Sequence, residues 1–105
     1  MLAVPSQYPK LTPVEYFAWE EQQICRHEYI KGEVYAMSGE TRNHSRIALK
    51  FGALLDNHLS NRSCEVFNSD CRVKIAKTND YTYPDVSISC DPRDRTTPNT
   101  SPILA

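Results

Sequence analysis

The chain has 105 residues, the length of one small domain. Apolar residues make up 40% of it and charged residues 24%, a globular mixture that excludes a wholly disordered chain. The net charge of −1 excludes a global basic field of the kind that attracts nucleic acid. No aliphatic run is long enough to cross a membrane, and the N-terminus lacks the pattern of a secretory signal.

Charge is unevenly distributed along the chain. Residues 1–40 have a net charge of −3, residues 41–77 of +4 and residues 78–105 of −2. A basic middle segment beside acidic ends is compatible with a surface that binds phosphate next to a metal-binding pole. Composition alone favours the simpler interpretation, a solvated face with scattered charges.

The four cysteines, Cys25, Cys64, Cys71 and Cys90, show no two-residue spacing of the kind used by zinc or redox sites. Three of them lie in or beside apolar runs, where a free cysteine behaves as a small hydrophobic residue. The sequence therefore predicts reduced cysteines and a cytoplasmic protein.

The first elements have clear local signals. Residues 1–9 contain two prolines and little periodicity, which predicts a flexible lead-in. A helix is expected from Pro13 to about Gln23, because Thr12 can cap it and Glu15 completes a capping box. Glu20 and Glu21 on this helix are expected in solvent. The runs 26–30 and 33–37 flank a Lys-Gly pair and predict a β-hairpin.

A second helix is expected from Asn43, as its cap, to about Leu59. Its apolar residues recur every three or four positions and predict one buried stripe, made of Ile47, Ala48, Phe51, Leu54, Leu55 and Leu59. Strands are expected over 64–67, 72–75 and 81–90, with a turn at Asn79-Asp80. From Asp91 the sequence is polar and aperiodic until 103–105, which looks like the start of another strand.

The local string Tyr83-Pro84-Asp85-Val86 is the strongest chemical signal. A proline within a strand marks an edge, a strand start or a bulge, because it cannot donate a backbone hydrogen bond. A carboxylate such as Asp85 in apolar surroundings needs a partner, and a divalent metal ion or a basic side chain would serve. By itself, a Pro-Asp pair is a weak signal.

The order of elements adds specificity: a capped helix, a hairpin, an amphipathic helix and then strands with Pro-Asp. This order resembles the front half of the PD-(D/E)XK nuclease core. Longer strings resemble the bacterial Uma-two family of proposed restriction endonucleases over nearly the whole chain, from about residue 10 to residue 105. The strings lie at 10–16, 27–39, 66–70, 83–86 and 90–94.

The resemblance implies an α/β fold with a mixed sheet flanked by helices, formed by a single restriction-endonuclease-like domain over 10–105. It implies that Asp85 is a metal-binding aspartate, that Glu33 is a supporting acid and metal ligand, and that His44 faces the same cleft. The alternatives remain open: Glu33 as a solvated carboxylate at a strand end, and His44 as a helix-terminal residue making a cap-like hydrogen bond. Asp70 also lies in a matching string, without a clear role.

The implied chemistry is hydrolysis of DNA phosphodiesters with Mg²⁺ or Mn²⁺. In the family, a second carboxylate and a lysine follow on the next strand, and neither is present in these 105 residues. We therefore expect a truncated and inactive form of a cytoplasmic endonuclease. A missing strand would expose a sheet edge that favours association, including homo-oligomers. The alternative is a non-catalytic module that binds nucleic acid through the basic segment 41–77.

Overall fold

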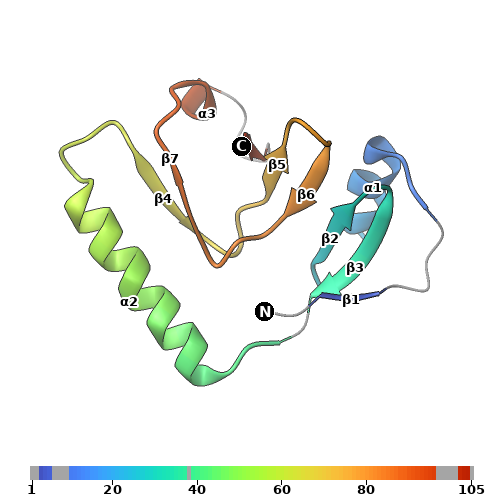
Figure 1. The fold of residues 1–105 in the computed structure, drawn as a ribbon, viewed down its shortest axis with the longest axis horizontal. Coiled ribbons are helices and arrows are strands. Elements are labelled where there is room, and N and C mark those ends of the chain that lie inside the picture. Colours follow the sequence, from blue (N-terminus) through green and yellow to red (C-terminus); the bar gives the residue numbers. More distant parts are fainter. Residues whose placement is uncertain (1–2, 6–9, 38, 97–101, 105) are drawn as a thin grey trace. The chain divides into compact units, whose positions relative to one another are not determined.

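The computed structural model describes residues 3–5, 10–37, 39–96 and 102–104. The chain divides into two compact units. Figure 1 labels the helices and strands. Unit 1 comprises residues 1–39 and 74–82, and unit 2 comprises residues 40–73 and 83–105. The single domain predicted over 10–105 stays a prediction. No helix among the described residues combines the length and the apolar character that a membrane span requires.

Unit 1 begins with the predicted capped helix. Helix α1 spans Pro13–Glu20. The side chain of Thr12 accepts a hydrogen bond from the Glu15 amide at 3.3 Å, and the Glu15 side chain accepts one from the Thr12 amide at 2.8 Å. This capping box confirms the predicted start. The helix ends three residues earlier than Gln23, because the amides of Gln22 and Gln23 form tighter i→i−3 bonds to Trp19 and Glu20.

The predicted hairpin is confirmed as β2, His27–Ile30, and β3, Glu33–Met37. Its two turn residues, Lys31 and Gly32, have φ of 52° and 82°. Positive φ at both central positions matches the twist of the flanking strands.

Strand β1, Ala3–Pro5, pairs antiparallel with the other side of β3. The prediction of a flexible lead-in is therefore wrong for these three residues, because backbone pairing with an open strand edge needs no sequence periodicity. The rest of the lead-in lies outside the described residues.

The core of unit 1 is aromatic. Strand β6, Asp80–Thr82, pairs with β2 through Tyr29 and Tyr81. Both rings are buried with Tyr16 and Val34, and the rings of Tyr16 and Tyr29 stack with centroids 4.9 Å apart. The Tyr16 hydroxyl donates to the backbone carbonyl of His27, which fixes α1 on the sheet. Such buried aromatic pairs add specific geometry to the apolar area they bury.

Glu20 departs from its predicted solvated position. Its side chain is buried and lies 2.9 Å from Nδ1 of His27, which is buried as well. The same carboxylate accepts a hydrogen bond from the His27 amide at 2.7 Å. A buried carboxylate is tolerated only when it is hydrogen-bonded, and this pairing supplies the partners. Helical spacing alone could not show that β2 would cover this side of α1.

The remaining strand of unit 1 follows β2 and β6 in the order β1-β3-β2-β6-β5. Strand β5 is Val73–Ile75, close to the predicted 72–75. The turn before β6 has Asn79 at φ 58°, which confirms the predicted turn at Asn79-Asp80.

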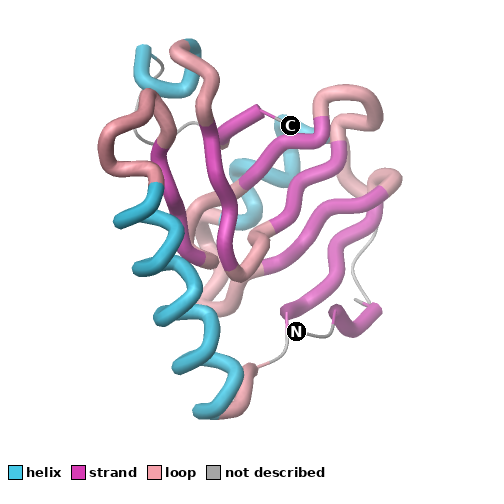
Figure 2. The backbone as a smooth tube through the Cα atoms, turned by 60° about the vertical axis from the view of Figure 1, so that its left-hand side comes forward, coloured by secondary structure: helices cyan, strands magenta, loops and turns pink. Residues whose placement is uncertain are grey.

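Unit 2 contains the long helix α2, Arg42–His58, which runs alongside β4 (Figure 2). The predicted helix 43–59 is thus confirmed with a shift of one residue. The prediction that its apolar stripe is buried is wrong: no described residue of α2 is buried, and Ile47, Phe51 and Leu54 are exposed. The N-cap of α2 is Thr41 rather than Asn43: the Thr41 side chain accepts from the His44 amide at 3.1 Å. Both side chains can cap, and the one that precedes the first helical residue does so.

Strands β4, Glu65–Asn68, and β7, Val86–Ser89, form a separate antiparallel ribbon in unit 2. The prediction of one strand over 81–90 is wrong, because the chain leaves one sheet after Thr82 and enters another at Val86. Pro84 lies in this interruption, where its missing N–H costs no ladder bond. Strand β8, Ile103–Leu104, confirms the predicted strand start, and the Ile103 amide donates to the Arg72 carbonyl.

A disulfide joins Cys64 to Cys90, which corrects the prediction of reduced cysteines. The register of the ribbon explains it: Glu65 pairs with Ser89, so the next position outward sets Cys64 opposite Cys90. Sequence spacing could not reveal this pair, because the two cysteines are 26 residues apart and meet only through strand pairing.

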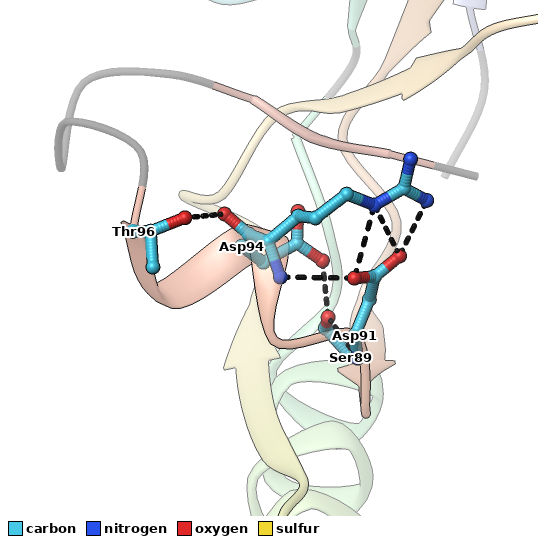
Figure 3. A network of polar contacts seen from close by, with 5 residues as sticks. Ser89, Asp91, Asp94 and Thr96 are labelled. Atoms are coloured by element: carbon cyan, nitrogen blue, oxygen red, sulfur yellow. Dashed lines mark hydrogen bonds and ion pairs between the residues drawn. The ribbon is translucent and has the colours of Figure 1, made fainter.

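A network of polar side chains lies at the C-terminal end of β7, next to the disulfide (Figure 3). The short helix α3, Arg93–Thr96, falls in the segment predicted to be aperiodic. Asp91 accepts a hydrogen bond from the Arg93 amide at 2.9 Å and pairs with its guanidinium at 2.6 Å. Asp94 accepts from the Ser89 hydroxyl. The guanidinium of Arg93 holds the pKa of Asp91 below its ordinary value. These side-chain contacts start a helix where apolar periodicity is missing.

Candidate metal centre

Asp85 lies at the end of the β4–β7 ribbon that is opposite the disulfide. It immediately precedes Val86, which pairs with Asn68 at the last step of the register. The backbone position of Asp85 is therefore fixed by the ribbon, while the chain before it is free of ladder bonds at Pro84. The side chain is about one-third exposed. This is a position from which a carboxylate can reach a ligand and still be held in place.

His44 reaches Asp85 from the first turn of α2. Its Nε2 lies 2.8 Å from Oδ2 of Asp85 and 3.4 Å from Oε2 of Glu40. Glu40 is four residues before His44, just outside the N-cap Thr41. The capped start of the helix therefore orients both side chains toward Asp85. The structure brings together two of the predicted site residues, Asp85 and His44, and adds Glu40.

The electrostatics of the cluster favour an ionised Asp85. Desolvation acts to raise its pKa, but the hydrogen-bonding interactions with Glu40 and His44 and the charge of His44 outweigh it, so that the pKa lies below its ordinary value. An ionised carboxylate with close polar partners is the form that binds a cation.

The donor set fits a divalent cation. One ligand atom from each of Glu40, His44 and Asp85 lies within 4.8 Å of the other two. Oδ1 of Asp85 is buried and has no hydrogen-bond partner among the described residues. A buried polar atom without a partner calls for an explanation, and an ion is one. Two carboxylates match Mg²⁺ and Mn²⁺, whereas the imidazole can act as a ligand or orient Asp85.

The cluster opens onto a hollow of about 610 Å³ between α2 and the ribbon. Glu40 and Asp85 lie on its wall, together with small and apolar residues of the helix and the strands, including Ala48, Gly52 and Phe67. A second hollow of about 390 Å³ is lined by residues of α2 and of the segment entering β7, including His44, Phe51 and Asp85. The carboxylates are thus accessible to a ligand from outside.

Two other residues of the sequence prediction, Glu33 and Asp70, are not among the residues of this cluster. Glu33 begins β3 in unit 1, is exposed, and accepts a hydrogen bond from the Tyr35 hydroxyl at 2.9 Å. Asp70 follows β4 in a turn, where its amide donates to the Asn68 side chain at 2.9 Å. Neither of these two hydrogen bonds joins the residue to Glu40, His44 or Asp85.

Glu40 is the residue that sequence reasoning missed. It lies between the predicted hairpin and the predicted second helix, in a segment without strand or helix periodicity. The usable signal was its distance from the helix start: a carboxylate just before an N-cap can lie beside a side chain of the first turn, here His44. That signal had meaning only once the helix was known to begin at Arg42.

Comparison with known proteins gives consistent results. Residues 13–104 match the model of the Uma2 family, described as "Putative restriction endonuclease". The chain is 51% identical over 88 residues to the Synechocystis protein slr1290, covering 84% of this chain and 46% of that protein. It is 38% identical over 78 residues to sll1609 from the same organism, covering 74% of this chain and 44% of that protein.

A solved structure supports the fold. It is that of a protein from Anabaena variabilis titled a putative nuclease belonging to DUF820, with a TM-score of 0.63 and 22% identity. The match covers 74% of this chain and 42% of that one. The predicted restriction-endonuclease-like α/β fold is thereby confirmed. The chain spans less than half the length of each of these three relatives. Because the family model matches residues 13–104, nearly the whole chain, the chain belongs to the Uma2 family.

Proposed function

We propose that the Glu40–His44–Asp85 cluster is the metal site of a DNA endonuclease of the Uma2 family. The observation that carries this proposal is the convergence of three ligand atoms within 4.8 Å beside the buried, unpartnered Oδ1 of Asp85. The family description supports nuclease chemistry, and its DNA substrate, the activity of the whole protein and a cytoplasmic location are part of the proposal.

Each side chain has a distinct role in this proposal. Asp85 offers Oδ1 to the cation and Glu40 offers a second carboxylate oxygen. His44, with its proton on Nε2, donates to Oδ2 of Asp85 and so fixes the orientation of that carboxylate. A bound Mg²⁺ or Mn²⁺ would activate water and offset charge on a scissile phosphate. Glu33, on β3 of unit 1, remains proposed as a supporting acid and metal ligand.

Two protein carboxylates and a histidine do not fill an octahedral shell. Mg²⁺ usually keeps several waters and takes further oxygens from substrate phosphates. The cluster therefore leaves coordination positions for water and a phosphodiester, which is the arrangement that hydrolysis requires.

The test is a calorimetric titration of the chain with Mn²⁺ and with Mg²⁺. We expect Asp85→Asn to weaken Mn²⁺ binding at least tenfold, because the substitution removes one negative charge and a ligand oxygen. Asp56→Asn is the matched control: Asp56 lines the same large hollow but is outside the cluster, so its loss should leave binding unchanged. Equal Mn²⁺ affinity of wild type and Asp85→Asn would refute the metal site.

A second candidate function rests on α2. Arg42, Arg46 and Lys50 are spaced four residues apart and all three are exposed. They therefore form a basic row along the helix. Such a row can contact consecutive phosphates of a nucleic acid without catalysis.

A further inference from the structure

Helix α2 presents an apolar row that is more than half exposed among the described residues. Ile47, Phe51 and Leu54 follow the i, i+4, i+7 spacing of one helix face, and they are 68%, 54% and 69% exposed. No residue of this 17-residue helix is buried among the residues described. An amphipathic helix of a globular protein normally packs its apolar stripe on a core, and a large exposed apolar patch marks an interaction site.

The ribbon beside α2 is equally incomplete. Within the described residues it has two strands, so each strand has one unpaired edge. Ile88 on β7 is also exposed. A two-stranded ribbon is marginal in water, and an unpaired edge is a template for another strand. One additional segment could complete both features: its apolar surface would cover the row on α2, and a strand of it would pair with an edge of the ribbon.

The relatives indicate what this segment is. Each contains more than twice the length that matches this chain. We propose that polypeptide corresponding to the other half of these relatives docks on unit 2, covers the Ile47–Phe51–Leu54 row and pairs with an edge of the ribbon. One such segment can cover the apolar row of α2 and pair with the ribbon edge at the same time. A second copy of this chain, by contrast, offers only another helix and ribbon of the same kind.

The docking surface adjoins the metal centre. The hollow of about 390 Å³ is lined by Ile47 and Phe51 of the apolar row and also by His44 and Asp85. A segment seated there lies beside the carboxylates, where it can add ligands or close the site to water. The docking itself requires no metal, so its test is independent of the proposed nuclease activity.

The test is coexpression of the 105-residue chain with a tagged polypeptide made of the part of slr1290 outside the match. We expect a one-to-one complex by size exclusion with light scattering. Leu54→Asp should weaken it at least tenfold, because a buried charge replaces an apolar contact. Ala53→Asp adds the same charge at an exposed position outside the apolar row, one residue from Leu54 and so about 100° around the helix, and should have no comparable effect. Circular dichroism checks that both variants keep the helix.

Three results would overturn the docking proposal: no complex, a complex insensitive to Leu54→Asp, or a homodimer of the 105-residue chain that Leu54→Asp disrupts. If the slr1290 part is insoluble, a fusion of that part to this chain can still test whether it covers the apolar row. In the fusion, Leu54→Cys should resist maleimide and Ala53→Cys, at an exposed position outside the apolar row, should react, as judged by mass spectrometry of the α2 peptide. Equal reaction at both positions refutes the docking.

Discussion

His44 and Asp85 are 41 residues apart in the chain, yet their side chains meet at 2.8 Å. The contact depends on two local features: the Thr41 cap, which fixes the first turn of α2, and the last pairing of the ribbon, which fixes Val86. His44 thus acts on the charge and orientation of Asp85 even where it does not touch a ligand.

We predict that His44→Ala raises the pKa of Asp85. Desolvation alone would raise it, and the hydrogen bonds with Glu40 and His44 hold it down. Because the folded-state pKa is depressed, the interaction stabilises the protein above the unfolded pKa of about 3.9 and is lost as pH falls through the folded pKa. Carboxyl NMR titration measures the change.

His58→Ala is the control for this titration, since His58 is exposed at the far end of α2. It should leave the Asp85 titration unchanged. An Asp85 pKa that is the same in wild type and His44→Ala would contradict the positioning role of His44.

At the scale of elements, the β4–β7 ribbon has a covalent cross-link at one end and a residue of the candidate metal centre at the other. The Cys64–Cys90 disulfide and the α3 network close one end, and Asp85 stands at the other. The strands are only four residues long each, so covalent closure is a large share of what holds them in register. The ribbon in turn determines where Asp85 stands relative to α2.

We predict that reducing the disulfide, or replacing both cysteines with Cys64→Ser and Cys90→Ser, lowers the free energy of unfolding. A cross-link over 26 residues corresponds to about 3–4 kcal/mol in the chain-entropy treatment. Urea unfolding with and without reductant measures it. Cys25→Ser, which removes an exposed free thiol, should have no comparable effect. Four titratable thiols in native protein purified without reductant would show that the disulfide is absent.

At the scale of the whole molecule, charged and apolar surface run side by side on α2. The basic row Arg42–Arg46–Lys50 borders the apolar row Ile47–Phe51–Leu54, because Lys50 lies three residues after Ile47 and four before Leu54. A protein segment on the apolar row would therefore lie beside a nucleic acid bound along the basic row. The net charge of −1 does not show this arrangement, because acidic residues, mainly in other segments, cancel the positive charge of the basic row.

We predict that DNA binding by the chain weakens with added salt. The basic row should determine how steeply the binding constant falls as the salt concentration rises. Replacing Arg42, Arg46 and Lys50 with Gln should reduce the slope of log K against log salt by about one per lost phosphate contact. Fluorescence anisotropy measures it. Asp85→Asn should leave this slope unchanged, and any cleavage should be lost. A slope insensitive to the triple substitution would exclude the basic row as the DNA contact.

Much of the fold was predictable because local chemistry determined it. The Thr12–Glu15 capping box, the left-handed Lys31-Gly32 turn and the extent of α2 are set by residues within a few positions of one another. For these features, the interacting groups are close in sequence, so the sequence itself shows them. Asp85 and His44 are far apart in sequence, and only the resemblance to the Uma-two family led us to expect them at one cleft.

Tertiary structure alone decided the rest. The strand break at Pro84, the Cys64–Cys90 disulfide, the buried Glu20–His27 pair and the place of Glu40 beside Asp85 all depend on which strand or helix lies next to them. Such pairings join residues far apart in the chain, and their energy depends on register and burial. The sequence by itself determined the local elements and the family; only packing determined which polar groups meet.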